Sequence, residues 1–181
     1  IAGPVLNDFV RTPNLPWTIS AARLKNQFGW RRVHLVNDLE AMAMAVPVLT
    51  SRERLCLSQA WRARNRNIAI LAPGTGLGKA FLVKMENGDY LPVQSEGGHA
   101  DFAPVNEEQV DLWCYLRRKF GHVSLERILS GSGQVNIYRW LVDSGRYREP
   151  RIVRKMMKTM DPARVITQMG LEKKYPLCVA A

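Results

Sequence analysis

The sequence predicts an α/β fold, and two observations carry this prediction. First, the segments RRVHLVND, LEAMAMAVPVL and NIAIL read in order as a strand, a helix and a strand, an alternation typical of α/β architecture. Second, the apolar runs on either side of GTGLG read as two strands joined by a glycine turn, which is a β-hairpin. The composition, with 46% hydrophobic and 23% charged residues, is typical of a soluble globular protein.

The first part of the chain follows this scheme. A short helix is expected from Ser20, in SAARLKNQFGW, because it has a partial apolar stripe and Gly29 can stop it. Residues 31–38 are expected to form a strand, and residues 39–49 a helix that closes near Pro47. The arginine-rich residues 51–66 are expected to be a surface connection.

The second part begins with the hairpin and becomes helical. The segment DYLPVQSEGGHADFAP is so rich in Gly and Pro that we expect a loop that displays side chains. A helix is expected in NEEQVDLWCYLRRKFG, with Asn106 as its cap, acids in its first turn, bases in its last, and Gly121 at its end. Residues 124–145 are expected to form a short helix, a Gly-Ser turn and a second helix. Residues 146–174 are expected to be partly helical, and residues 175–181 to open another helix.

The chain length and the cysteine content limit the classes of protein to which the chain can belong. A chain of 181 residues is long enough for one large domain or parts of two, and no apolar run approaches the roughly 18 residues that a membrane span needs. Cys56, Cys114 and Cys178 are widely spaced without a zinc-ligand or disulfide pattern, so we expect reduced thiols and a cytoplasmic location. The start, IAGPVLNDFV, has no initiator Met and no signal peptide, and we expect a partial gene product.

The net charge of +10 is concentrated in two regions. Residues 51–66 hold five arginines and one acid, and residues 139–174 hold ten basic residues and four acids. Nucleic-acid binding is one interpretation. A solvated face is the favoured one, because neither region interleaves aromatic residues as a base-stacking surface does.

The glycine-rich stretch Asn67–Val83 has two interpretations. It is no Walker loop, because Ala80 follows Gly78-Lys79 and Pro73 stands where the first Gly belongs. Its G-x-G-x-G spacing also differs from the G-x-G-x-x-G of dinucleotide-binding folds. A glycine hairpin can still hold phosphate, since its amides approach an anion closely, but on this motif alone an ordinary turn is favoured.

Asn37 and Asp38 lie where the predicted strand meets the predicted helix. Ligands of α/β folds collect at the carboxyl ends of strands, and an Asp there can act as a general base for an alcohol. The alternative is a capping box, in which Asn37 caps the helix and Glu40 bonds back three residues later. Both can hold together, with Asn37 as the cap and Asp38 facing a cleft.

Three further side chains are candidates for polar recognition. Glu96 and His99 lie three residues apart in SEGGHADF, and a carboxylate with an imidazole can grip vicinal sugar hydroxyls; an exposed polar loop is the alternative. Glu126 lies at a helix start, where the helix dipole alone favours an acid. The segment SGSG, residues 130–133, offers helix N-terminal amides to a ligand or is a plain connector.

The order of these motifs is more specific than any one of them. A strand ending in Asn-Asp, a strand–GTGLG–strand unit, EGGHADFAP and GHVSLERILSGSG together resemble the bacterial glucokinase family, from Ala2 to Leu141. The resemblance implies the actin-like (ribonuclease H-like) ATPase fold, two α/β lobes around a cleft, incomplete here. Residues 1–48 would belong to the C-terminal portion of the small lobe, and residues 49–181 to the large lobe.

The resemblance also implies a reaction, which is phosphoryl transfer from Mg-ATP to the C6 hydroxyl of glucose, the first step of glycolysis. ATP and Mg²⁺ are the implied cofactors, and Asp38 matches the catalytic base. The residues that match sugar-binding positions are Asn37, Glu96, His99 and Glu126. The residues that match the loop touching the ATP phosphates are Gly74, Thr75, Gly76, Leu77 and Gly78. No protein residue is assigned as a metal ligand.

Partners and alternatives follow from the same resemblance. Glucose and ATP are the expected partners, a homodimer is a possible assembly, and neither a membrane nor nucleic acid is expected. The main alternative is a truncated relative that binds sugar without turnover; nucleic-acid binding through the arginine-rich stretches is less favoured.

The chain departs from the family pattern in three respects. It holds no D-x-G-G-T-N strand and no C-terminal adenosine-binding Gly-Gly segment, so the isolated chain is expected to bind ATP poorly and turn over little substrate. Lys79 replaces a small apolar residue and either adds a phosphate contact or points to solvent. The segment PNLPW, residues 13–17, differs from many relatives, although Asn14 and Trp17 match their pattern.

Overall fold

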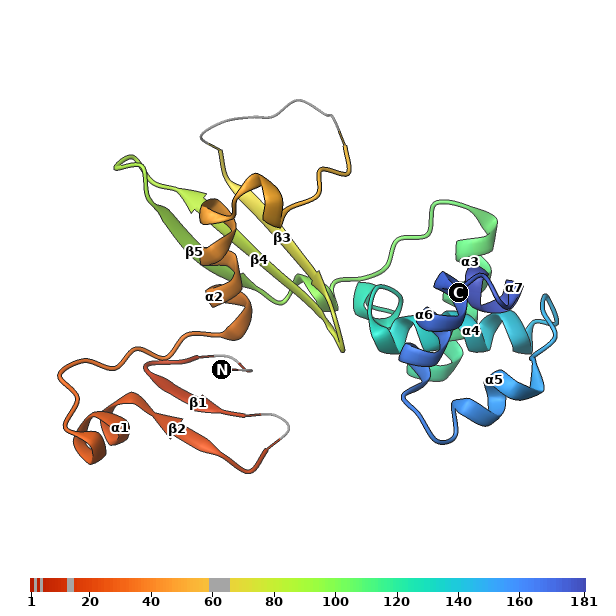
Figure 1. The fold of residues 1–181 in the computed structure, drawn as a ribbon, viewed down its shortest axis with the longest axis horizontal. Helices are drawn as coiled ribbons and strands as arrows, with labels where there is room; N and C mark the ends of the chain where they lie inside the picture. Colours follow the sequence, from red (N-terminus) through yellow and green to blue (C-terminus); the bar gives the residue numbers. More distant parts are fainter. Residues whose placement is uncertain (2, 4, 13–14, 59–65) are drawn as a thin grey trace. The chain divides into compact units, whose positions relative to one another are not determined.

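The computed structural model describes residues 1, 3, 5–12, 15–58 and 66–181, so Ala2, Asn14 and part of the arginine-rich stretch lie outside the described residues. The described chain forms two compact units (Figure 1). The first consists of Ile1–Ile70 and Lys79–Ser95, and the second of Leu71–Gly78 and Glu96–Ala181. The expected division into lobes at residue 48 stays a prediction.

The first unit begins with a two-stranded ribbon and a helix. Strands β1 (Phe9–Arg11) and β2 (Thr18–Ser20) pair antiparallel, with Phe9 opposite Ser20. Helix α1 (Ala21–Phe28) follows directly, and the hydroxyl of Ser20 caps it by accepting from the amide of Arg23. The helix ends at Gly29 in the left-handed region, with φ 65°. The predicted start and stop of this helix are thereby confirmed.

The expected strand over residues 31–38 is wrong. Residues 31–37 form no regular structure, although Val33 and Leu35 are partly buried between exposed neighbours. A strand requires a paired neighbour, and among the described residues two bonds join the backbone of this segment to Ile1, from the Ile1 amine to the Val36 carbonyl at 2.9 Å and from the Asp38 amide to the Ile1 carbonyl at 3.0 Å, without continuing as a ladder. The following helix is confirmed, since α2 (Asp38–Ala45) passes into the 3₁₀ turn η1 (Val46–Val48), which contains Pro47.

A three-stranded sheet contains the predicted hairpin. Strands β3 (Ile68–Pro73), β4 (Leu77–Lys84) and β5 (Tyr90–Ser95) lie in that order, and β4 pairs antiparallel with β5. Ala80 and Leu82 of β4 are buried against Ala43 of α2, and this helix lies along the sheet (Figure 1). The expected loop over residues 89–104 is therefore wrong in its first part. Pro92 fits there because β5 is an edge strand, where a missing N–H costs no ladder bond.

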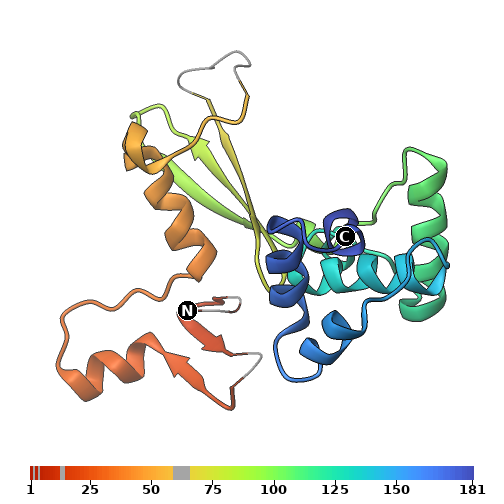
Figure 2. The ribbon, with the colours of Figure 1, turned by 45° about the vertical axis from the view of Figure 1, so that its right-hand side comes forward.

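The second unit is mainly helical, and its helices gather in one cluster (Figure 2). They are α3 (Glu107–Phe120), α4 (Gly131–Asp143), α5 (Arg151–Met156), α6 (Pro162–Leu171) and α7 (Pro176–Ala180). Their apolar faces enclose a core whose largest fully buried side chains include Leu116, Tyr138, Ile166 and Leu177. Within the described residues, none of the helices has the length and apolar character that crossing a bilayer requires.

Two predictions for this unit can be compared with the structure in detail. Asn106 caps α3 by accepting from the Gln109 amide at 2.9 Å, and Gly121 ends the helix, as expected. The expected short helix after Ser124 is a single 3₁₀ turn, η4 (Leu125–Arg127). The expected Gly-Ser turn is instead the start of α4, because the Ser130 hydroxyl accepts from the Gly133 amide and caps the helix there.

Candidate functional site

The turn between β3 and β4 belongs to the second unit and is closed by its own backbone. The Gly74 amide donates to the Gly76 carbonyl at 2.8 Å, which leaves Thr75 at the tip. One residue further, the Leu77 amide donates to Oε2 of Glu126 at 2.9 Å, although 49 residues separate the two. The glycine hairpin is therefore hydrogen-bonded to Glu126, the side chain for which the family resemblance implies sugar binding.

Two glycines make close approaches around this peptide. A Cβ on Gly76 would lie 2.6 Å from Oε2 of Glu126, so the bare glycine leaves room for the carboxylate. A Cβ on Gly98 would lie 2.1 Å from the Leu77 carbonyl oxygen, so the 3₁₀ turn η3 (Gly97–His99) rests directly against this strand. The Leu77 residue thus lies between the two segments that carry Glu96, His99 and Glu126.

The same two segments also pair with each other. The Leu125 amide donates to the Ala100 carbonyl at 2.9 Å, the Phe102 amide donates to the Val123 carbonyl at 2.9 Å, and Asp101 forms a β-bridge with Ser124. This short ladder joins two segments that are distant in the sequence through backbone hydrogen bonds. It fixes the loop after β5 beside the turn that carries Glu126.

Glu96, His99 and Glu126 converge as a consequence. The His99 Nε2 atom lies 3.7 Å from Oε2 of Glu96, and its Nδ1 atom lies 4.0 Å from Oε1 of Glu126. Exposure falls across the cluster, from 83% for the Glu96 side chain to 62% for His99 and 28% for Glu126. An imidazole between two carboxylates, reachable from solvent, can both donate to and accept from neighbouring hydroxyl groups.

The opposite side of the hairpin meets the start of α4. The Gly131 amide donates to the Gly74 carbonyl at 2.8 Å, and an open hollow of about 540 Å³ is lined by Gly74, Thr75, Gly131 and Ser132 among others. In the part of the chain that the structure describes, no acceptor is found for the amides of Thr75, Gly76 and Ser132. Exposed amides at a turn and at a helix start suit an anion such as phosphate.

Asn37 and Asp38 belong to the first unit. The Asn37 side-chain oxygen accepts from the amides of Leu39 at 2.9 Å and Glu40 at 3.4 Å, so its capping role is confirmed. The capping box is not formed, because the Glu40 carboxylate instead accepts from the Gln94 side chain at 2.8 Å. Asp38 is exposed in the first turn of α2, with one carboxylate oxygen bonded to the Leu39 amide at 3.0 Å.

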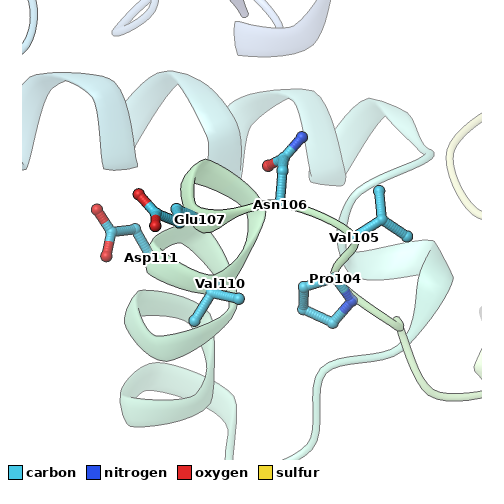
Figure 3. A pocket seen from close by; sticks show the side chains of 6 residues that line it. All are labelled: Pro104, Val105, Asn106, Glu107, Val110 and Asp111. Carbon is cyan, nitrogen blue, oxygen red and sulfur yellow. The ribbon is translucent and has the colours of Figure 1, made fainter.

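A separate hollow lies at the start of α3 and contains none of the predicted site residues (Figure 3). Two of its polar side chains have partners, since Asn106 caps the helix and Asp111 pairs with Arg146 at 2.8 Å. Glu107 and Asp111 project from the same side of the helix, while Val105 and Pro104 lie on the preceding loop (Figure 3). These bonds are those of an ordinary helix start rather than of a ligand site.

Sequence reasoning missed the roles of Leu77 and Gly98 at the cluster. Leu77 was assigned to a phosphate contact, yet its amide is engaged by Glu126, and its phosphate contact stays a prediction. Gly98 looked like one glycine of a loose loop. The sequence does carry one signal, the two adjacent glycines before His99. Such glycines allow another backbone segment to approach closely, but they do not identify that segment.

Comparison with known proteins agrees with this arrangement of motifs. The glucokinase family model matches residues 1–181. A glucokinase of Photorhabdus laumondii is 39% identical over 178 residues, which are 98% of this chain and 52% of that protein. A glucokinase of Campylobacter jejuni is 36% identical over 178 residues, which are 98% of this chain and 51% of that one. The chain thus spans about half the length of these relatives.

Solved structures show the same fold. A glucokinase from an Antarctic psychrotroph superposes with a TM-score of 0.80 at 30% identity, covering 99% of this chain and 53% of that one. A glucokinase from Balamuthia mandrillaris, solved in complex with glucose, superposes with a TM-score of 0.70 at 20% identity, over 98% of this chain and 54% of that one, and supports the fold alone. The order of the motifs, the whole-chain match and the shared fold lead to one conclusion: the chain belongs to the glucokinase family.

Proposed function

We propose that this chain contributes the sugar-binding cluster and one phosphate-binding hairpin of an ATP-dependent glucokinase, which phosphorylates glucose at its C6 hydroxyl. The observation that carries the proposal is the position of the hairpin. Its Leu77 amide holds Glu126 in the cluster with His99, and its Gly74 carbonyl holds the start of α4. One turn of backbone therefore adjoins both the acceptors that suit hydroxyls and the amides that suit phosphate.

The sugar side follows from hydrogen-bonding chemistry. Each sugar hydroxyl donates one hydrogen bond and accepts others, and adjacent hydroxyls present this pattern side by side. Glu96 and Glu126 would accept from hydroxyls, while His99 would donate or accept according to which ring nitrogen carries the proton. The relatives that are 39% and 36% identical to this chain are named glucokinases, which supports glucose as the sugar proposed here.

The phosphate side would use backbone. The amides of Thr75 and Ser132, which line the hollow, and the amide of Gly76 next to Thr75 would hold the nucleotide's phosphates at the hairpin and the start of α4. Bound ATP supplies the phosphoryl group that is transferred. The described residues contain no group of three or more His, Cys, Asp or Glu that could hold an ion, so no step is assigned to Mg²⁺ here.

Asp38 is the proposed general base. Its carboxylate lies exposed at the first turn of α2, and among the described residues one of its oxygens is bonded to a backbone amide, that of Leu39. The other oxygen would accept the proton of the attacking C6 hydroxyl, and Asn37, anchored by its cap and by its bond to the Gly3 carbonyl at 3.0 Å, would orient the sugar. A division into a small and a large lobe near residue 48 is part of the proposal.

The proposal also includes a cellular location and an oligomeric state. Cys56, Cys114 and Cys178 are free thiols, and the exposed Cys56 suits the reducing cytoplasm that we infer as the location. A homodimer stays a prediction.

Calorimetric titration with glucose tests the sugar site. We expect His99→Ala and Glu96→Gln to weaken glucose binding about tenfold or more, because a site built to pair hydroxyls loses much when one partner is removed. The matched control is His122→Ala, since His122 is similarly exposed at 59% and pairs with Asp101 at 2.6 Å outside the cluster. Equal affinities for all three variants and the wild type would reduce the cluster to a polar surface loop.

A coupled assay for glucose 6-phosphate tests catalysis. Where the protein shows turnover, Asp38→Ala is expected to reduce it by roughly 10²–10⁴-fold while glucose binding remains measurable. Turnover close to wild type would remove Asp38 from the base role. Glucose binding without any turnover of the wild-type chain would instead favour the alternative of a sugar-binding relative.

A further inference from the structure

We infer that Gly76 and the Leu77 amide are positioning elements of the sugar site: the hairpin sets the place of the Glu126 carboxylate in addition to any contact with phosphate. This inference rests on the proposed function, because it assigns Glu126 to the sugar. The inferred role of Gly76, the second glycine of GTGLG, is to leave room for the Glu126 carboxylate at the sugar site.

The geometry singles out Gly76 among the glycines of the turn. A Cβ there would lie 2.6 Å from Oε2 and 3.4 Å from the carboxyl carbon of Glu126, whereas a Cβ on Gly74 would meet nothing within 4 Å. The Gly76 backbone is not in the left-handed region, so an alanine is compatible with its conformation. The atom in the way is the end of a flexible side chain, so the expected response is that the carboxylate moves while the fold remains.

The displaced Glu126 carboxylate would lose the contacts that fix its position. It accepts from the Leu77 amide at 2.9 Å, a charge-assisted hydrogen bond, and its other oxygen lies 4.0 Å from the His99 ring. With a side chain only 28% exposed, Glu126 has few other orientations in which it stays beside His99. The lack of a Cβ at residue 76 and the amide at residue 77 therefore act together on one oxygen atom.

The test compares two alanine variants, one in the turn and one outside the cluster, by calorimetric titration with glucose. Gly76→Ala is expected to weaken glucose binding about tenfold, the effect of displacing one hydrogen-bonded group in a polar site. His122→Ala is expected to keep the glucose affinity within about twofold, because His122 pairs with Asp101 outside the cluster. Circular dichroism of both variants checks that the fold is kept.

A double-variant cycle then tests the route of the effect. In a Glu126→Ala background the carboxylate is absent, so adding Gly76→Ala should change glucose affinity no further. A readout that needs no variant at residue 76 is the NMR signal of the Leu77 amide, which should shift and exchange faster with solvent in Glu126→Ala than in the wild type.

The outcomes separate the inference from the proposed function. If the wild-type chain binds no glucose, the proposed sugar site fails. If it binds glucose and Glu126→Ala weakens binding, but Gly76→Ala binds glucose as tightly as His122→Ala does, the site stands and the positioning role is refuted. A Gly76→Ala effect that persists in the Glu126→Ala background, or a Leu77 amide unchanged by Glu126→Ala, also overturns the inference.

Discussion

Replacing Gly98 with alanine should destabilise the second unit and loosen the sugar site together. Gly98 is buried in the 3₁₀ turn η3, and its Cα faces the carbonyl of Leu77 at the start of β4. An added Cβ would lie 2.1 Å from that oxygen, 3.3 Å from its carbon and 3.5 Å from the Leu77 Cβ. Unlike the carboxylate beside Gly76, this neighbour is backbone and cannot rotate away.

The magnitude follows from this overlap. Ordinary van der Waals contact begins near 3.4 Å, so the turn and the strand must separate by about 1.3 Å. Inserting a methyl group into a packed interior typically costs 1–3 kcal/mol, and displaced backbone places this site at the upper end, about 2–3 kcal/mol. For a chain of this length each kcal/mol lowers Tm by roughly 2–4 °C, so we expect a decrease of about 4–12 °C.

Thermal unfolding followed by far-UV circular dichroism measures this change, because most of the helix lies in the second unit. Gly74→Ala is the matched control, since the same chemical change there meets nothing within 4 Å. Glucose affinity measured on the folded variant below its Tm should also fall, because Glu96 and His99 flank the displaced turn. A Tm for Gly98→Ala equal to that of Gly74→Ala would refute the close packing of η3 on Leu77.

Three further predictions concern stability. Glu149→Gln should cost about 1–3 kcal/mol in chemical denaturation, because a carboxylate that is only 13% exposed accepts hydrogen bonds from Arg139 and the Tyr138 hydroxyl and forms an ion pair with Arg154; Glu108→Gln, at 67% exposure, should cost under about 0.5 kcal/mol. Asn37→Ala should cost about 0.5–2 kcal/mol through the lost cap of α2, and an unchanged denaturation midpoint would contradict it. Burial, followed by the hydrogen bond and charge of Asp143, raises the pKa of Tyr115 from 10.0 to about 12. The neutral phenol therefore contributes stability that is complete below pH 10 and is lost as the pH rises to about 12, so Tyr115→Phe should flatten that loss in a pH series of melting curves, and an identical alkaline decline would count against it.

The sequence by itself determined the features that depend on short stretches of chain. The caps at Ser20, Asn37 and Asn106 each bond an amide two or three residues away, so the residue types suffice to place them. The β3–β4 hairpin follows in the same way from two apolar runs around a glycine turn. The order of the motifs was specific enough to indicate the glucokinase family, which the whole-chain match confirms.

Pairing with a neighbour was beyond what local patterns show. Residues 31–37 carry the alternation of a strand but have no ladder in the described structure, whereas residues 90–95 contain a proline and still form β5. A strand is stabilised by the hydrogen bonds of the chain beside it, so its existence depends on segments elsewhere. The proline is tolerated because β5 lies at an edge of the sheet, a position that only the fold defines.

The convergence of the site was decided by tertiary structure alone. Glu126 reaches the Leu77 amide across 49 residues, and His99 lies between two carboxylates that come from separate turns. Nothing in the spacing of GTGLG distinguishes Gly74, whose missing side chain faces open space, from Gly76, whose missing side chain leaves room for a carboxylate. That distinction depends on which atoms occupy the space beside each glycine, and the packing of distant segments, rather than the local sequence, fills that space.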